Sequence, residues 1–403
     1  MSAVPTFAVV LAGFAAFLDL YATQPLLPLL AKTFGASAFQ VGLTVTAPTI
    51  AVAIAAPPVG RLADRFGLRR TILTAAMALT AATALAATAT SLRQLIFWRF
   101  LQGIVTPGIF ASTIAYIHEV WPASRAGRGT AAYMSGTVLG GFTGRALAGI
   151  VAADSSWHGS FIALAILNGA VAAALWLWLP SEGHSQRRGA KARAEGAMPG
   201  TPDAPLGHLF VNRRLLATFG VGFCVLFTQV AMFTYVTFLL AAPPFNLSTV
   251  ALGWLFVVYL VGAAVTPLSG AWVDRYGHRS GIASAMAIGG AGALLTLVPT
   301  LVAVVAGLAL CSTGVFIAQA TTSGYIGAVT RRDRALAVGL YSTFYYAGGS
   351  AGGALPAAVW ARWGWPGCVA LVMIVQAIGA STAFTQWLPT EGPSRAAIPE
   401  AGV

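Results

Sequence analysis

Residues 60–69 read GRLADRFGLR, and residues 270–279 read GAWVDRYGHR. Each stretch follows a long apolar run, and the two share the pattern Gly-x-x-x-Asp-Arg-x-Gly-x-Arg at an offset of 210 residues. Because only 8% of the residues are charged, an Asp-Arg pair repeated in the same spacing is a specific signal. The repeat indicates that the chain consists of two homologous halves.

A second set of matches lies further along each half, at an offset of 208 residues. It supports the charged repeat but is weaker evidence, because the chain contains 45 glycines. The matching residues are Tyr133, Gly140, Gly141, Gly144, Leu147 and Trp157, paired with Tyr341, Gly348, Gly349, Gly352, Leu355 and Trp365.

The composition is not that of a soluble protein. Of the 403 residues, 57% are hydrophobic and 8% are charged, and the mean hydropathy is +0.78. Soluble domains carry about 25% charged residues on average, whereas a lipid bilayer accepts an apolar exterior. We therefore expect an all-α integral membrane protein.

The sequence predicts no cofactor, no metal site and no enzyme. The five histidines and the cysteines at 224, 311 and 368 lack the spacing of a metal site or a disulfide framework. A Walker loop and a catalytic triad are also missing from the sequence.

Long apolar runs predict twelve membrane-spanning helices, since about 20 apolar residues cross the hydrocarbon core. No Lys or Arg precedes the first run, which favours a transmembrane helix over a signal peptide. The predicted spans are 6–31, 40–60, 71–90, 94–117, 130–153, 159–180, 215–241, 249–270, 281–299, 301–327, 337–360 and 367–388.

Lys and Arg residues gather in alternate loops. With the N-terminus in the cytoplasm, eighteen of them lie in cytoplasmic segments, and only Lys32, Arg93 and Arg362 lie in outer loops. This asymmetry predicts that both termini are cytoplasmic, in a plasma membrane and most naturally a bacterial inner membrane. The net charge of +12 is therefore a topology signal, and no nucleic-acid partner is expected.

Residues 181–212 are rich in Ser, Gly, Pro, Arg and Lys, as expected of a flexible linker. The predicted organisation has an N-terminal six-helix half (1–180), a cytoplasmic linker (181–212), a C-terminal six-helix half (213–390) and a cytoplasmic tail (391–403).

The doubled loop pattern resembles the signature of the major facilitator superfamily, over the whole chain apart from the linker and tail. The resemblance implies twelve transmembrane helices in two six-helix halves. It also implies that the loop aspartate, here Asp64, bonds neighbouring basic residues and a helix end of the other half, as a latch that closes one face. The family usually has a basic residue where Leu68 stands. The predicted latch residues are Gly60, Asp64, Arg65, Gly67, Arg69, Asp274, Arg275 and Gly277.

Two further motifs match that superfamily in part. Arg99-x-x-Gln102-Gly103 resembles its motif on span 4, whose arginine is linked to proton coupling. Residues 136–145 resemble the antiporter motif Gly-x-x-x-Gly-Pro-x-x-Gly-Gly, with Gly141 replacing the proline and Arg145 the last glycine. Four glycines of this segment are expected to permit close helix packing: Gly136, Gly140, Gly141 and Gly144.

Three ionisable residues fall within the predicted spans: Asp19, Arg99 and Arg145. A charge in a membrane is costly and indicates function by default, and Arg145 has no charged twin because its repeat partner is Gly353. Asp19 is predicted to carry the coupling proton, with Arg145 first and Arg99 second controlling its proton affinity. The alternatives are that Arg99 extends to the outer interface, that Arg145 is a structural tie or binds an anionic substrate, and that Asp19 is a permanent ion-pair partner.

Further polar and aromatic residues within the spans are candidates for the lining of a substrate cavity. These are Gln24, Gln102, Gln229, Tyr235, Gln319 and Tyr345. Five prolines are expected to kink helices: Pro25, Pro28, Pro107, Pro267 and Pro356.

Together, these features favour a secondary active transporter that moves a small solute by alternating access, with proton-coupled efflux. The expected partners are a small-molecule substrate, protons and the lipid bilayer, and the protein is expected to be a monomer. Sugar or metabolite transport, by export or by proton symport, stays open because fold does not fix substrate. A non-transporting membrane sensor is the alternative of another class.

Overall fold

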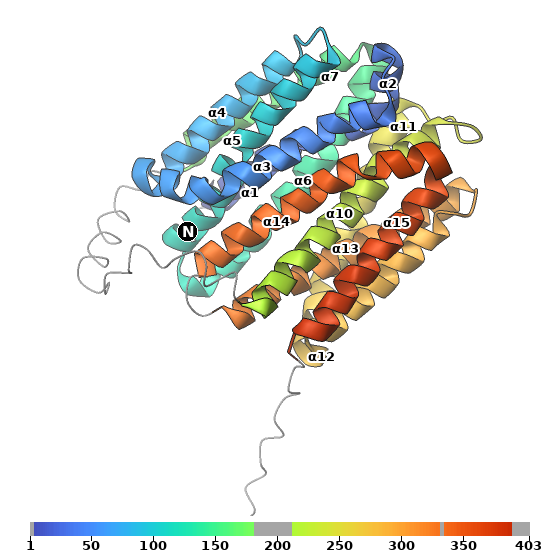
Figure 1. Cartoon of the computed structure of the whole chain (residues 1–403). Coiled ribbons are helices and arrows are strands. Elements are labelled where there is room, and N and C mark those ends of the chain that lie inside the picture. Colours follow the sequence, from blue (N-terminus) through green and yellow to red (C-terminus); the bar gives the residue numbers. More distant parts are fainter. Residues whose placement is uncertain (1–3, 181–211, 331–333, 389–403) are drawn as a thin grey trace, which may run out of the picture.

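The computed structural model describes residues 4–180, 212–330 and 334–388, and within these ranges it contains helices and no strand. Two groups of helices lie side by side in Figure 1, one coloured blue to green (α1 to α7) and the other yellow-green to red (α10 to α15). They correspond to the two sequence halves and confirm the all-α fold class. Most of the predicted linker and the whole predicted tail, 391–403, lie outside the described residues.

The N-terminal half contains seven α-helices and one 3-10 helix. These are α1 (Val4–Leu18), η1 (Gln24–Leu26), α2 (Leu27–Phe34), α3 (Ala38–Phe66), α4 (Leu68–Ala86), α5 (Leu92–Val120), α6 (Ala123–Asp154) and α7 (Trp157–Trp178).

The described part of the C-terminal half repeats this order. Its elements are α10 (Arg213–Ala241), α11 (Thr249–Trp254), η2 (Leu255–Val257), α12 (Val258–Leu295), α13 (Leu301–Val329), α14 (Arg334–Ala354) and α15 (Pro356–Gln386).

Seven of the described helices are individually long and apolar enough to cross a membrane. Other passes are divided or fused. The first is split into α1, η1 and α2, while α12 bends at Gly277 and so contains both the end of the eighth pass and the ninth. A second bend, at Gly364 of α15, separates the end of the eleventh pass from the twelfth. The chain therefore makes the twelve passes expected from its sequence.

Gly67 and Gly277 hold equivalent places in the two loop motifs. Their φ angles are +87° and +85°, a region that residues with a side chain rarely adopt. Each glycine turns the chain sharply between two passes, which explains why the motif needs glycine at this position in both halves.

The bundle has two ends, which we name by what they carry. The end at Phe66 and Gly277 is the motif end, and the end at α2 and α11 is the opposite end (Figure 1). At the opposite end, Ser37 accepts a hydrogen bond from the Gln40 backbone, and the Gln40 side chain accepts one from Ser37 N, which completes a capping box. Other hydroxyl side chains that cap helices there are Ser91, Ser156, Ser248 and Thr300.

A row of glycines lets α6 lie directly against α1. A Cβ atom on Gly140 would lie 2.2 Å from the Phe14 carbonyl oxygen, and one on Gly144 would lie 1.7 Å from that of Leu18. Gly136 meets the same helix one turn earlier. At three of the four motif glycines, the backbones of α6 and α1 therefore touch and leave no room for a side chain.

The contact recurs in the other half, where a Cβ atom on Gly348 of α14 would lie 2.1 Å from the Phe223 carbonyl oxygen of α10. Gly141 differs from its neighbours in the motif. It faces Arg145, whose Nη1 donates a hydrogen bond to the Gly141 carbonyl at 2.6 Å.

We expect Gly140→Ala to lower thermal stability, because its methyl group would overlap the α1 backbone at a cost of about 1–3 kcal/mol. Gly127→Ala is the matched control, since no atom lies within 4 Å of a Cβ atom at this position on the same helix. Thermal unfolding of the purified proteins in detergent compares them. Equal unfolding midpoints for the two variants would contradict the packing role of Gly140.

The charge asymmetry of the loops predicts that the motif end faces the cytoplasm. A single cysteine introduced as Ser185→Cys, in the linker segment, should stay unlabelled by a membrane-impermeant maleimide in intact cells and react once the cells are opened. A cysteine at Arg362, in an outer loop by the same prediction, is the matched control and should react in intact cells. Labelling of the linker position from outside would reverse the predicted orientation.

Candidate functional site

The first pass is interrupted halfway. α1 ends at Leu18, residues 19–23 form turns, and helix resumes at Gln24. Pro25 and Pro28 contribute to the interruption, because proline has no N–H to donate within a helix. Instead of the kink expected from these prolines, the pass is broken, and the break leaves backbone carbonyl groups that need other partners.

Asp19 opens this break and is 1% exposed. Its Oδ2 accepts hydrogen bonds from Thr83 Oγ1 of α4 and Asn168 Nδ2 of α7, both at 2.6 Å. Its Oδ1 is buried without a partner among the described residues. The carboxyl group is therefore held by two neutral donors on one side and left free on the other.

Arg99 of α5 is fully buried beneath the break. Its Nη1 donates to the Asp19 carbonyl at 2.8 Å, and its Nη2 donates to the Leu20 carbonyl at 2.7 Å. Its Nε donates to the Thr44 carbonyl of α3 at 3.0 Å. A guanidinium thus satisfies the carbonyls exposed where α1 ends, so the alternative that Arg99 extends to the outer interface is wrong for this conformation.

Gln102 connects this clamp to the carboxyl group. Its Oε1 accepts from Arg99 Nη1 at 2.6 Å, and its Nε2 donates to Thr83 Oγ1 at 2.8 Å. We call Asp19, Thr83, Arg99, Gln102 and Asn168 the Asp19 cluster. It is a continuous polar network inside the N-terminal half, and Gln102 belongs to it and not to the residues around Arg145.

Arg145 lies at the other end of the break and is 3% exposed. Its Nε donates to Gln24 Oε1 at 2.7 Å. Three aromatic rings surround its Cζ, which lies 4.9 Å from the ring centre of Tyr21, 4.6 Å from Phe256 and 4.9 Å from Tyr259. We call these five residues the Arg145 cage.

The cage joins the two halves of the protein. Tyr21 belongs to the break in the first pass, Phe256 belongs to η2, which interrupts the eighth pass, and Tyr259 is the second residue of α12. Gln24 Nε2 also donates to Thr234 Oγ1 of α10 at 3.1 Å. Two interrupted passes therefore meet at one arginine, an arrangement typical of transporter substrate sites.

The geometry places Arg99, and not Arg145, next to Asp19. Arg99 bonds the backbone of Asp19, whereas the described hydrogen bonds and ring contacts of Arg145 involve other residues. The Asp19 carboxyl accepts from Thr83 and Asn168, so the alternative of a permanent ion pair with Arg145 is wrong for this conformation.

Contacts between the halves lie from the middle of the bundle to its opposite end. Thr46 Oγ1 of α3 donates to the Ser350 carbonyl of α14 at 3.2 Å, and Thr343 Oγ1 donates to the Ala53 carbonyl at 3.1 Å. Figure 1 shows α3 and α14 side by side along this seam. Near the opposite end, a Cβ atom on Gly149 of α6 would lie 2.4 Å from the backbone of α11.

The remaining cavity candidates fall in different places. Gln229 lies near the Tyr259 phenol of the cage, whereas Tyr345 lies against the Tyr346 ring, with 5.5 Å between the ring centres. The Tyr235 hydroxyl instead donates to the Gly353 carbonyl at 2.9 Å, where it fixes helix packing. Gln319 is half-buried on α13, away from the described contacts of either cluster.

A family model, described as Major Facilitator Superfamily, matches residues 9–250 and 223–402. The two matches together cover nearly the whole chain. The chain belongs to the major facilitator superfamily. It is a membrane transporter of this superfamily, and its relatives indicate no catalytic activity.

Curated relatives in bacteria are also transporters of this superfamily. The MFS-type transporter YybF of Bacillus subtilis is 29% identical over 91% of this chain and 89% of its own length. The inner membrane transport protein YnfM of Escherichia coli is 29% identical over 93% of this chain and 88% of its own length. These relatives support an integral membrane protein.

Among solved structures, a bacterial homologue of the human lysosomal transporter Spinster, in an inward-facing and occupied conformation, has a similar fold. The TM-score is 0.75 and the sequence identity 17%, with 94% of this chain and 96% of that chain covered. At this identity the likeness supports the fold alone.

The loop motif that marks the superfamily is partly structural in this chain. Arg69 Nε donates to the Leu179 carbonyl at 2.8 Å, and Arg279 donates to the Trp387 carbonyl. In both halves, the last arginine of the motif thus caps the C-terminal end of the last helix of its own half.

Asp64, the centre of the predicted latch, is exposed at the motif end. Among the described residues, its carboxylate has no hydrogen bond or ion pair, and the described contacts between the halves lie elsewhere. The side chain of Asp274 lies outside what the structure describes. The latch therefore stays a prediction, which concerns a conformation with the motif end closed.

We expect Asp64→Asn to reduce the transport rate while the amount of protein in the membrane stays normal, because only the ionised side chain can form the latch. Asp154→Asn, at an exposed acid near the opposite end, is the control and should transport normally. Transport rates are compared at equal membrane abundance. Wild-type rates in a well-expressed Asp64→Asn protein would eliminate the latch.

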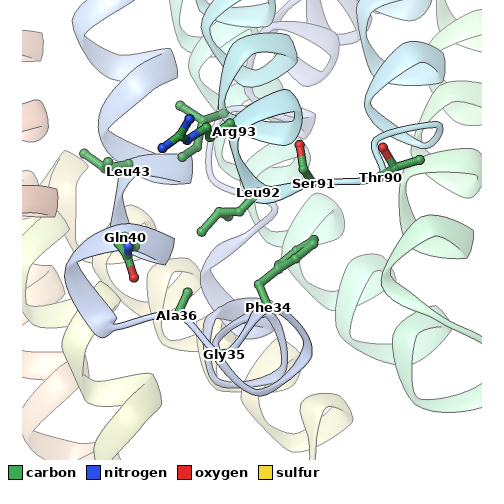
Figure 2. Close-up of a pocket in the computed structure, with 10 residues that line it drawn as sticks. Phe34, Gly35, Ala36, Gln40, Leu43, Thr90, Ser91, Leu92 and Arg93 are labelled. Carbon is green, nitrogen blue, oxygen red and sulfur yellow. The ribbon is translucent and has the colours of Figure 1, made fainter.

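A surface pocket of about 480 Å³ opens at the opposite end, between α2 and the first turns of α3 and α5. Figure 2 shows Phe34, Gln40, Leu92 and Arg93 around it. None of its lining residues belongs to the Asp19 cluster or the Arg145 cage. The chemistry described above therefore lies inside the bundle and not in this pocket.

Proposed function

We propose that the protein is a proton-coupled exporter of a small solute, in which Asp19 binds and releases the coupling proton. The observation that supports this most strongly is the Asp19 carboxyl group, buried with two neutral donors on one oxygen and none on the other. A carboxylate in such a place is costly as an ion, and protonation removes the charge.

The break in the first pass can couple protonation of Asp19 to the arrangement of the two halves. Asp19 and Gln24 lie at its two ends, and Gln24 bonds both Arg145 and Thr234 of the other half. A change of charge at Asp19 acts on the segment whose far end joins the halves. Proton binding would thereby favour one arrangement of the halves over the other.

Arg99 serves this mechanism as the anchor of the break. From α5, it donates hydrogen bonds to the Asp19 and Leu20 carbonyls. Gln102 accepts from Arg99 and donates to Thr83, which in turn bonds the Asp19 carboxyl group. A change of protonation at Asp19 therefore reaches a network that is already fixed on three helices. We assign Arg99, ahead of Arg145, the role of positioning Asp19.

Efflux is favoured by the segment from Gly136 to Gly144, which resembles the antiporter motif and packs on α1 beside the break. Everted membrane vesicles with a panel of candidate solutes test the function and its direction. Solute accumulation driven by an acidic vesicle interior supports export by antiport. The exterior of an everted vesicle is the cytoplasmic face of the membrane. Accumulation driven only by an acidic exterior would mean that solute and protons move in the same direction, which contradicts export by proton antiport.

Two other outcomes keep the alternatives distinct. Transport of a sugar or a metabolite with protons moving in the same direction would establish symport on this fold. Solute binding with no flux under any gradient would indicate a membrane sensor.

A further inference from the structure

We propose that Arg145 binds the carboxylate of the transported solute, and that the solute is an organic anion with a flat apolar body. The inference rests on the proposed transport function and names the class of its substrate. The geometry points to it through an arginine that is buried at the junction of the halves and has no anionic partner among the described residues.

The neighbours of Arg145 leave its charge uncompensated. Its described hydrogen bonds go to the Gln24 side-chain oxygen and the Gly141 carbonyl, both neutral groups. The one acid within the spans, Asp19, is engaged by Thr83 and Asn168 in its own cluster. Taking a guanidinium out of water is costly unless a counter-charge or a full set of hydrogen bonds replaces the water.

The bonding capacity left on the guanidinium fits a carboxylate. A guanidinium has five N–H donors, and two of them are used, by Nε and by one N–H of Nη1. For the remaining donors of Nη1 and Nη2, the described residues supply no acceptor. Two neighbouring N–H groups on one planar fork match the two oxygens of a carboxylate.

The aromatic rings around Arg145 indicate the chemistry of the part of the ligand that lies beyond its carboxylate. Tyr21, Phe256 and Tyr259 place their faces within 5 Å of the guanidinium carbon. Such walls favour a flat apolar body next to the bound carboxylate and disfavour a cationic solute, which the arginine repels.

The position also fits a substrate site in a moving transporter. The cage takes members from both halves, so a ligand bound there contacts both and is exchanged when they separate. The repeat supports a specialised role, because the twin position, Gly353, has no room for a side chain. A Cβ atom there would lie 2.6 Å from Thr46 Oγ1.

The test uses three probes that share one ring system: 2-naphthoate, 2-naphthamide and 2-naphthylmethylamine. Each is added to the purified protein in detergent at one pH, and binding is measured from the shift of the thermal unfolding midpoint with probe concentration. We expect 2-naphthoate to bind at least about tenfold more tightly than the amide, and the amine to give no shift. Equal binding of the acid and the amide, or no binding of the acid, overturns the proposal.

Variants assign the binding to Arg145. Arg145→Gln should lose the preference for the acid over the amide, while Arg362→Gln, at an exposed arginine, should keep it. If Arg145→Gln does not fold, Arg145→Lys serves instead and should weaken 2-naphthoate binding, because an ammonium lacks the planar fork. Unchanged selectivity in a folded Arg145 variant overturns the assignment.

A variant of the proton site separates this inference from the proposed coupling. Asp19→Asn changes the charge beside the break and shifts the affinities for the acid and the amide together, but it should keep the preference for 2-naphthoate over the amide, because the Asp19 carboxyl makes no described contact with Arg145. Selective binding together with failed proton coupling would leave the anion site standing and reject the proposed function. Proton-driven transport of other solutes without selective anion binding would support the proposed function and reject the anion site.

Discussion

Asp19→Asn should abolish solute accumulation driven by a pH gradient, while exchange of solute across the membrane at equal pH continues. Asparagine keeps the size of the side chain and can still accept hydrogen bonds from Thr83 and Asn168, but it cannot bind and release a proton. No other acid lies within the predicted spans, so no second carboxyl there can replace it. Proteoliposomes loaded with solute allow both modes of transport to be measured on one preparation.

Asp154→Asn is the matched control, since it removes an exposed acid at the end of α6. It should retain both gradient-driven accumulation and exchange. If Asp19→Asn accumulates solute as well as this control does, Asp19 is not the proton carrier. If it loses exchange as well, its carboxyl is required for the movement of the halves and not for coupling alone.

Replacing Arg99 with methionine should produce the largest loss of stability among the substitutions considered. The change leaves the Leu20 and Thr44 carbonyls and the Gln102 side-chain oxygen without the donors that satisfy them now, while the Asp19 carbonyl keeps only the Ala22 N–H. A buried polar group without a partner costs about 1–3 kcal/mol. The three together predict a loss of several kcal/mol, or failure to fold, and Arg99→Lys should recover only part, since an ammonium cannot span three acceptors in this geometry.

Arg93→Met provides the comparison on the same helix. Arg93 is exposed near the start of α5, so the same chemical change there should leave the thermal unfolding midpoint within a degree or two of the wild type. Unfolding midpoints in detergent, together with the fraction of protein recovered as a single species, measure the effect. An Arg99→Met protein as stable as Arg93→Met would show that the break in the first pass does not depend on this clamp.

The architecture was largely predictable because it depends on patterns that persist along the chain. Apolar runs of sufficient length predicted the twelve passes, and the charged repeat predicted the two halves. The glycines of that repeat, Gly67 and Gly277, adopt the same unusual backbone conformation in each half. Hydropathy and backbone requirements are local properties, so a single sequence reveals them.

The arrangement inside the bundle was predictable only in part. The sequence singled out Asp19, Arg99 and Arg145 because charge is rare in the spans, but it could not tell which arginine faces which group. That depends on how each helix is rotated and where the first pass breaks. The prolines predicted a kink, whereas the actual break extends over residues 19–23 and brings Arg99 to the backbone of Asp19.

The aromatic members of the Arg145 cage were missed for a similar reason. Tyr21 lies two residues after Asp19, and Phe256 and Tyr259 are spaced as neighbours on a helix face, but aromatic residues are common in membrane spans. Their role follows from the meeting of two interrupted passes, which are remote in sequence. Thr83 likewise became part of a site only when α4 was placed against the break.

Proton movement that accompanies solute transport can be measured directly. Wild-type and Asp19→Asn proteins are reconstituted into liposomes that contain a trapped pH-sensitive dye, and a transported solute identified in the vesicle panel is added outside. We expect solute entry to change the internal pH for the wild type and to leave it unchanged for Asp19→Asn, which still exchanges solute. Solute transport by the wild type without any change of internal pH would contradict proton coupling, and an undiminished change in Asp19→Asn would contradict the role of Asp19.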